Sequence, residues 1–185
     1  MALTVEQFYE TGSSAGFSRD FSFRVTDINI GGMSVSEGDD VLIFARTASL
    51  PGREIEDKLA NFGGHEFHLG GRAVYSNAAG YPIEFYCDEG IGLRDQFEKA
   101  SRSTFLNGVG GDGFGFNPGA KIVLQTLSKA GPTARGTSEI TLNGVSIRDI
   151  GDIDYTIADG TGEVVTFSVT FAYQFYDLNK NQGAG

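Results

Sequence analysis

The residue types that most often bind metals lie close together in one short segment, HEFH. His65, Glu66 and His68 could each supply a ligand atom to a zinc ion. The segment alternates as a strand does, however, and residues three apart in a strand point to opposite faces. No further set of ligands accompanies these side chains in the sequence. We therefore predict that the two histidines do not form a metal site.

The other reactive side chains do not assemble into a catalytic group. Cys87, the single cysteine, has no histidine beside it in the sequence and falls on an apolar parity, so we expect a buried, unreactive thiol. Glu54 and Glu56 could in principle transfer protons, but two acids on an exposed strand are more often a solvated face. We predict no catalytic residue and no enzyme activity.

A glycine-rich segment, NGVGGDGFGFNPG at residues 107–119, has the composition of a loop that binds phosphate or calcium. It does not lead from a strand into a helix, and it lacks the lysine of a P-loop. Its glycines and aspartate also miss the register of calcium-binding repeats. We interpret it as a mobile surface loop and expect no cofactor.

Composition narrows the class of protein. Fourteen Lys and Arg against 24 Asp and Glu give a net charge of −10, which argues against a surface that grips phosphates. The single cysteine excludes an internal disulfide and suits a reducing compartment. No apolar run is long enough to span a membrane, so we expect no membrane insertion. The length of 185 residues fits one domain, residues 1–185.

The elements that must position any functional surface are mostly strands, and the last one is the clearest. Residues 163–177 alternate apolar and small polar side chains throughout, which is the pattern of a half-buried strand. Fifteen extended residues would span about 50 Å at roughly 3.3 Å each, longer than a usual strand. We expect part of this strand to contact something beyond the domain's own core.

Shorter alternating segments precede it. Residues 20–28 and 41–47 predict two strands, which we expect to pair as a hairpin. Residues 53–62 and 65–69 predict two more, separated by two glycines that would form a bulge or bend. Asn143 and Gly144 fit either a two-residue hairpin or a strand that ends in a loop. Further strands are predicted at residues 81–89, 120–128, 138–147 and 153–157.

One longer helix is predicted at residues 91–104, where apolar side chains recur at helical spacing and opposite charges stand four residues apart. A short helix or arm is predicted at residues 1–18, and a flexible tail at residues 178–185. One helix among about eight strands indicates a mainly β domain with one flanking helix.

The order of these segments resembles a known family. FSFRV is followed by ARTASLPG, by EIEDKLANFGGHEFHLGG, by IEFYCDEGIGLRDQFEKA, by ITLNGVSIRDIGDIDY and by the closing strand. The LPG corner, the strand that enters a helix, and LNGV followed by IGDI carry most of the likeness. Together, over most of the chain, they resemble the tail tube proteins of contractile-tailed bacteriophages. Residues 107–119 are the least family-like part.

The resemblance implies a tail-tube β-barrel or sandwich that assembles into hexameric rings with a continuous inner β-barrel. The rings would stack into a tube inside a contractile sheath. Implied partners are further copies of the chain, the tail sheath protein, the baseplate and tail terminator proteins, the tape measure protein, and genomic DNA in transit without specific binding. The implied location is the tail of a virion assembled in the bacterial host cytoplasm.

Two alternatives remain at this stage. The tube protein of a type VI secretion system or of a phage-tail-like bacteriocin would share the fold and the ring geometry. A soluble ligand-binding β-barrel would instead be monomeric, with a closed apolar cavity.

Four acids are candidates for the lining of the channel: Glu54, Glu56, Glu84 and Asp88. They alternate with apolar residues that we expect to pack inward, namely Ile55, Leu59, Ile83, Phe85 and Cys87. The acids would then face water or a lumen, and ring symmetry would multiply each into a circle of like charge. The alternative is that they merely solubilise an outer face.

The corner formed by Leu50, Pro51 and Gly52 is the candidate for the joint between subunits. Proline and glycine fix a sharp change of direction, and the flanking strands carry charged faces. Gly52→Val should impair assembly more than folding of the monomer if this position needs a positive φ, which a β-branched residue resists.

Overall fold

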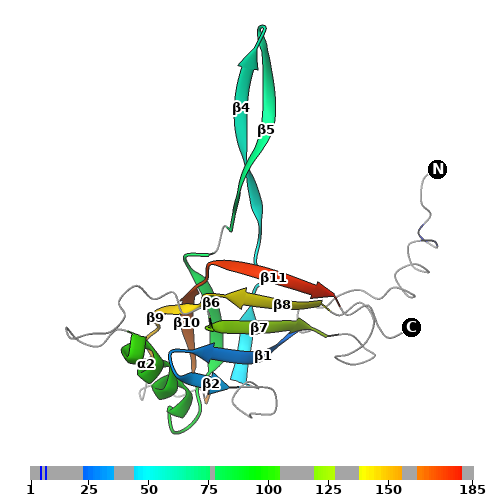
Figure 1. Ribbon diagram of the computed structural model, residues 1–185. Coiled ribbons are helices and arrows are strands. Elements are labelled where there is room, and N and C mark those ends of the chain that lie inside the picture. The colour runs from blue at the N-terminus through cyan, green and yellow to red at the C-terminus, as the bar shows by residue number, and fades with distance from the viewer. Residues whose placement is uncertain are drawn as a thin grey trace.

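The computed structural model describes residues 5, 7, 23–35, 44–75, 78–104, 119–127, 138–155 and 162–180. Most of this part of the chain consists of strands, with one helix between them (Figure 1). In chain order the elements are β1 (Phe23–Ile30), β2 (Met33–Val35), β3 (Ala45–Ala48), β4 (Glu54–Phe62), β5 (His65–Val74), β6 (Tyr81–Tyr86), α2 (Gly92–Thr104), β7 (Lys121–Thr126), β8 (Ser138–Asn143), β9 (Ser146–Ile150), β10 (Thr166–Ala172) and β11 (Phe175–Lys180).

The strands of the body form two antiparallel sheets. A five-stranded sheet has the order β11-β8-β7-β1-β2, and a four-stranded sheet has the order β3-β6-β10-β9. In Figure 1 the strands of the larger sheet run across those of the smaller one, an arrangement known from orthogonal sheet packing. The mainly β fold with one helix is as predicted.

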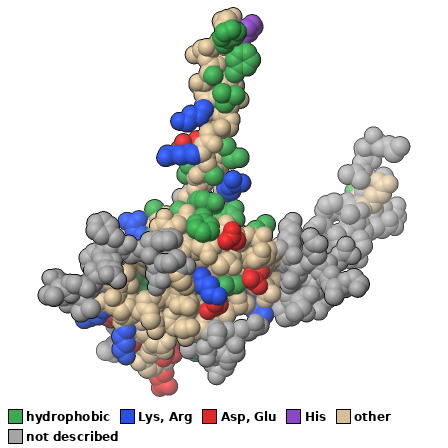
Figure 2. Space-filling model, viewed as in Figure 1, with side chains coloured by type: hydrophobic (Ala, Val, Ile, Leu, Met, Phe, Trp, Pro, Cys, Tyr) green, Lys and Arg blue, Asp and Glu red, His purple; other side chains and the backbone are tan. Residues whose placement is uncertain are grey.

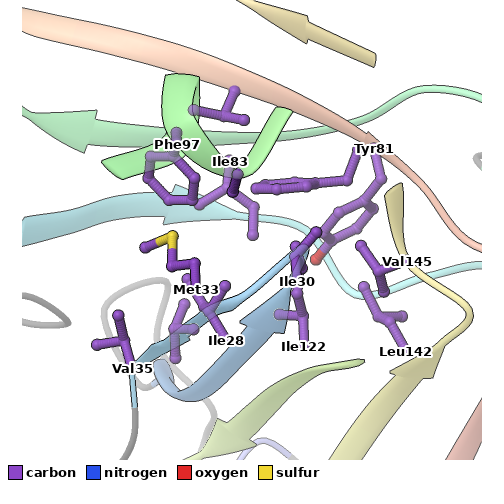
Figure 3. Close-up of a cluster of buried hydrophobic side chains, with 14 of the residues drawn as sticks. Ile28, Ile30, Met33, Val35, Tyr81, Ile83, Phe97, Ile122, Leu142 and Val145 are labelled. Atoms are coloured by element: carbon purple, nitrogen blue, oxygen red, sulfur yellow. The ribbon is translucent and has the colours of Figure 1, made fainter. Parts of the chain in front are cut away.

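The hydrophobic core lies between the two sheets. Alternation explains it, because every second residue of β10 and β6 points inward: Phe167, Val169 and Phe171 on one strand, and Tyr81, Ile83 and Phe85 on the other, are all buried. Side chains from β1, β2, β7 and β8 meet them from the larger sheet (Figure 3). Burial of this apolar surface is the main force that holds the sheets together.

Helix α2 covers one end of the sandwich and confirms the helix predicted at residues 91–104. Its buried face consists of Leu93, Phe97 and Ala100. The ring of Phe97 lies 5.1 Å from that of Phe85 and 6.0 Å from that of Phe171, centroid to centroid. Aromatic contacts of this kind add to the energy of burial. The helix is therefore fixed to the four-stranded sheet through its core face.

Within the described residues, strands β4 and β5 pair only with each other, and they project from the body as a long hairpin (Figure 1). Gly63 and Gly64 form the turn between them, with φ of 60° and 80°. Positive φ at both central residues is typical of the tight hairpin turns that match the twist of two strands. The prediction of a bulge or bend here was wrong, because the two glycines reverse the chain instead.

The closing segment is not one continuous strand. The alternation of buried and less buried side chains holds through Tyr173, but the chain then passes from β10 in the smaller sheet to β11 in the larger one. The Gln174 amide donates to the carbonyl of Asn143, 2.9 Å away, which places the start of β11 beside β8. β11 pairs with β8 as far as Lys180, so the first three residues of the predicted tail are part of a sheet. The over-long strand is thus two shorter strands that link both sheets.

Two predicted pairings also differ. β1 pairs with β2 and β7, whereas β3 pairs with β6, so the expected hairpin between the first two strands is wrong. The sequence analysis missed β2, three residues long. β8 and β9 belong to different sheets, so Asn143 and Gly144 connect the sheets and do not form a hairpin. Residues 151–155, at the predicted strand 153–157, have no regular structure.

Several predicted segments lie outside the described residues. These are the arm at residues 1–18 apart from two helical positions, Val5 and Gln7, almost all of the glycine-rich segment 107–119, and the end of the tail, residues 181–185. Within the described part of the chain, no helix has the length and apolar character needed to cross a membrane.

Candidate functional site

The projecting hairpin is an outgrowth of the four-stranded sheet. β3 pairs with β6 in the body, the chain continues from β3 into β4, and β5 returns to β6. In Figure 1 the hairpin rises roughly along the direction of β6. Strands β3 and β6 therefore continue into β4 and β5 as one long two-stranded ribbon. The body covers the β3–β6 part of this ribbon and leaves the β4–β5 part projecting.

Tyrosines anchor the root of this hairpin. Tyr75, just after β5, lies edge-on to Tyr173 and Tyr176, with centroid distances of 6.3 and 5.3 Å. The buried hydroxyl of Tyr81 donates to the backbone carbonyl of Ser49, just after β3. Burial raises the pKa of Tyr81, and the hydrogen bond to Ser49 offsets only part of that rise. Packing at the root thus fixes the direction of the hairpin.

One face of the hairpin is apolar and uncovered. The strand register places Ala60 opposite Phe67, and Lys58 opposite Leu69, on the face that also carries Phe62. We call Ala60, Phe62, Phe67 and Leu69 the apolar face. Phe62 is 81% exposed, Phe67 49% and Leu69 53%, and hydrophobic side chains line the hairpin in Figure 2. Contiguous exposed apolar surface marks an interaction site.

The opposite face of the hairpin is mostly polar, although Leu59 also lies on it, opposite His68. Asp57, Asn61, Glu66 and His68 lie on it by register, and the His68 imidazole contacts the Asp57 carboxylate. His65 pairs with Phe62 on the apolar side, so the two histidines point to opposite faces. Among the described residues, no group of three or more His, Cys, Asp or Glu could hold a metal ion.

The four-stranded sheet ends at two edge strands, β3 and β9, and helix α2 contacts β9. In the described part of the chain no strand pairs with the outer side of β3 or of β9. The free backbone N–H and C=O groups of an edge strand can pair with a strand from another chain. Both edges belong to one sheet and lie on its opposite sides, so copies of the sheet could join side by side.

The outward face of this sheet is hydroxyl-rich. Thr166, Ser168 and Thr170 alternate with the buried residues of β10 and point away from the core. Glu84 lies beside Ser168 by register. Its carboxylate accepts hydrogen bonds from the Arg46 guanidinium at 2.9 Å and the Thr47 hydroxyl at 3.3 Å.

The four candidate acids do not share one element. Glu54 and Glu56 lie on the hairpin and Glu84 on the four-stranded sheet, whereas Asp88 precedes α2. Glu56 accepts two hydrogen bonds of 2.8 Å from Arg72, and this contact lowers the Glu56 pKa. The expected burial of the apolar residues that alternate with these acids is only partly confirmed. Ile83 and Phe85 are buried as expected, but Ile55 and Leu59 are each 59% exposed.

Asp88 has a structural role that the lumen prediction overlooked. Its carboxylate accepts hydrogen bonds from the amides of Gly92 at 2.9 Å and Leu93 at 3.2 Å, the first residues of α2. Partial burial acts to raise its pKa, but the backbone hydrogen bonds outweigh that and lower it. Its neighbour Cys87 is half-buried against the core rather than fully buried.

The corner at Leu50, Pro51 and Gly52 lies between β3 and β4, at the root of the hairpin. Pro51 is buried and Leu50 is 59% exposed. Gly52 is not among the described glycines with a positive φ, so the condition for an assembly defect in Gly52→Val is not met. The predicted role of this corner as a subunit joint remains a prediction.

The apolar face was not predicted from the sequence as a functional surface. The signal that could have found it is NFGGHEF, in which two glycines stand between alternating strands, the pattern of a tight hairpin. A two-residue turn at those glycines places Phe62 and Phe67 on the same face of the hairpin.

Among solved structures, the fold of this chain is similar to that of protein chains from contractile injection assemblies. No family model matches the sequence, and no curated protein matches it either. A chain of the six-fold symmetrised baseplate of the anti-feeding prophage is similar in structure, with a TM-score of 0.59 and 13% identity over 90% of this chain and 97% of that one.

Two further solved structures are similar. A chain of the sheath-tube complex of the PVC extracellular contractile injection system has a TM-score of 0.58 and 10% identity, over 97% of this chain and 99% of that one. A chain of the anti-feeding prophage cap has a TM-score of 0.56 and 12% identity, over 97% and 95%. The resemblance to tail tube proteins is confirmed at the level of the fold: this chain folds as the proteins of such contractile assemblies do.

Proposed function

We propose that this chain is a structural protein that polymerises into the inner tube of a contractile tail, as stacked rings of six copies. The observation that carries the proposal is the projecting hairpin with its uncovered apolar face, joined to a sheet with two open edges. A monomer would expose this surface to water at a cost, whereas a polymer covers it.

Ring closure would use the open edges. If β3 of one copy lies beside β9 of the next, the contact is head-to-tail, and such contacts close into a ring when the rotation permits. The four-stranded sheets would then merge into one barrel, with their outward faces lining a channel. The six-fold symmetry of the anti-feeding prophage baseplate supports six copies.

Ring stacking would use the hairpin. It projects roughly along β6, hence roughly along the axis of such a barrel, and so reaches toward the next ring (Figure 1). Its apolar face would pack on a copy in that ring. Large exposed aromatic side chains are the usual anchors of protein interfaces, and Phe62 and Phe67 fit that role.

The finer parts of the proposal follow from the resemblance. All 185 residues would act as one tail-tube domain within a virion tail, surrounded by the sheath protein and bounded by baseplate and terminator proteins. The channel would hold the tape measure protein and then pass DNA into the host cell. No enzyme activity is proposed.

A second candidate is the tube of a related injection particle rather than of a phage. It is favoured by the similar chains, which come from the anti-feeding prophage and from an extracellular contractile injection system. The ligand-binding barrel gains no such support, since the space between the two sheets is filled by buried side chains (Figure 3).

The test compares substitutions on the two faces of the hairpin. Phe62→Ser with Phe67→Ser removes the aromatic anchors, and Asn61→Ser with Glu66→Ser, on the polar face, is the matched control. We expect the wild-type chain and the control to sediment as tubes that negative-stain microscopy can image, and the apolar-face variant to stop at rings or protomers. Normal tubes from the apolar-face variant would refute the role of the hairpin, and a wild-type chain that stays monomeric at high concentration would refute the tube.

A further inference from the structure

The outward face of the four-stranded sheet carries an ion pair. Glu84 on β6 is held by Arg46, and the sheet register places Asp149 of β9 on the same outward side, opposite Thr170. Arg148 is next to Asp149 in the chain and donates to the backbone carbonyl of Ala79, just before β6. Arg46 therefore balances Glu84 on this face, although the chain as a whole has a net charge of −10.

The position of each arginine is built into the backbone. The pairing of β3 with β6 shifts register between Ala45 and Thr47, which leaves Arg46 as an extra residue. The pairing of β9 with β10 shifts in the same way, and Arg148 is the residue left over. A β-bulge re-aims the side chain it carries. Both edge strands of the sheet thus use a bulge to present an arginine.

The contacts around Glu84 leave its carboxylate fully engaged. One oxygen accepts from Arg46 and the other from Thr47. The Arg46 guanidinium also lies over the Tyr86 ring, 5.8 Å from its centroid, where the ring attracts a cation. Since Glu84 and Tyr86 lie on the same face of β6, the three side chains form one cluster on the outward surface.

We propose that Arg46 sets the charge of the channel wall by neutralising Glu84, so that the tube passes polymers of either charge without retaining them. This rests on the proposed function, in which the outward face lines the channel. It replaces the expectation of an electronegative lining at this position with a neutral, hydroxyl-rich one. Ring symmetry would turn the loss of one partner into a circle of like charges, and confinement would strengthen their field.

The experiment uses tubes of the full chain and two labelled probes, a lysine-rich peptide and a single-stranded DNA oligonucleotide. Arg46→Gln unmasks Glu84, Glu84→Gln unmasks Arg46, and the double variant restores neutrality. Arg102→Gln is the control, because it removes one arginine from helix α2, where Glu98 keeps Arg94 as a partner. Negative-stain microscopy first shows that each variant forms tubes, and co-sedimentation at low salt then measures retention.

We expect wild-type, double-variant and control tubes to retain neither probe. Arg46→Gln tubes should retain the peptide, and Glu84→Gln tubes the oligonucleotide, each about ten-fold more than wild-type tubes and reversibly with added salt. Retention by the single variants that equals the wild type, or strong retention of the peptide by wild-type tubes, would overturn the inference alone. A wild-type chain that forms no tubes would overturn the proposed function together with it.

Discussion

Asp88 illustrates how a single carboxylate can order a helix. Its oxygens accept from the first two amides of α2, which have no partner within the helix. Asp88→Ala should therefore lower the free energy of unfolding by about 1 kcal/mol at neutral pH. Asp88→Asn should lower the free energy of unfolding by less, because its amide oxygen can still accept a hydrogen bond from the helix. Urea titration followed by circular dichroism measures both, and equal stability of the alanine variant and wild type would contradict the assignment.

The same residue predicts a pH dependence. The pKa of Asp88 is lower in the folded chain than its usual value of 3.8, so its contribution is present above that value and is lost as pH falls through the lower folded pKa. The stability difference between wild type and Asp88→Ala should thus shrink on acidification below about pH 4. A difference that stays constant down to pH 2 would show that the charge of Asp88 is not involved.

Tyr173 offers a substitution that should stabilise the protein. Its side chain is 2% exposed, and its hydroxyl has no hydrogen-bond partner among the described residues. A buried hydroxyl without a partner costs stability, whereas Tyr173→Phe keeps the edge-on ring contacts with Tyr75 and Tyr81. We expect the variant to unfold at higher urea, with a gain of about 1 kcal/mol. A loss of stability would mean that the hydroxyl is satisfied in solution.

Among the elements, the projecting hairpin depends on the backbone geometry of its turn. Gly63 has a φ of 60° with open space around its α-carbon, so only backbone strain opposes a side chain there. Gly63→Val should cost about 1 to 2 kcal/mol and loosen the hairpin, while Gly63→Asn should be tolerated. Limited trypsin digestion at Lys58 measures the effect. The prediction fails if both variants are cut at the wild-type rate.

Local elements were predictable from the sequence, and their partners were not. The helix spacing of Leu93, Phe97 and Ala100 and the alternation of β10 depend on neighbours along the chain, and both predictions are confirmed. Alternation gives a parity but does not say what covers each face. Ile55 and Leu59 were for that reason wrongly placed in the core, although their strand was predicted correctly.

The candidate site shows the same limit. Arg46 and Glu84 stand 38 residues apart in the chain, and no sequence pattern joins them. The alternation of the closing segment also continues past Tyr173 into Phe175, so it could not reveal that the chain changes sheets there. Pairing across sheets is a long-range property, which one sequence read by periodicity does not contain.

At the scale of the whole molecule, charge opposes assembly. Protomers with a net charge of −10 repel one another. Burial of the apolar face of the hairpin against another copy would favour association. Raising the salt concentration from about 0.02 M to about 0.3 M screens the repulsion and should lower the concentration at which tubes form. Light scattering during a protein titration at each salt concentration measures this threshold. Assembly that weakens with salt would indicate that ion pairs, and not apolar contacts, hold the tube.

The most direct test of the central claim is a cryo-electron microscopy reconstruction of the assembled full-length chain. We predict stacked rings in which β3 of one copy lies beside β9 of the next, the outward face of the four-stranded sheet lines the channel, and the hairpin packs on a copy in the adjacent ring. A channel lined by the five-stranded sheet, or a hairpin that points into solvent from an otherwise closed assembly, would contradict the account.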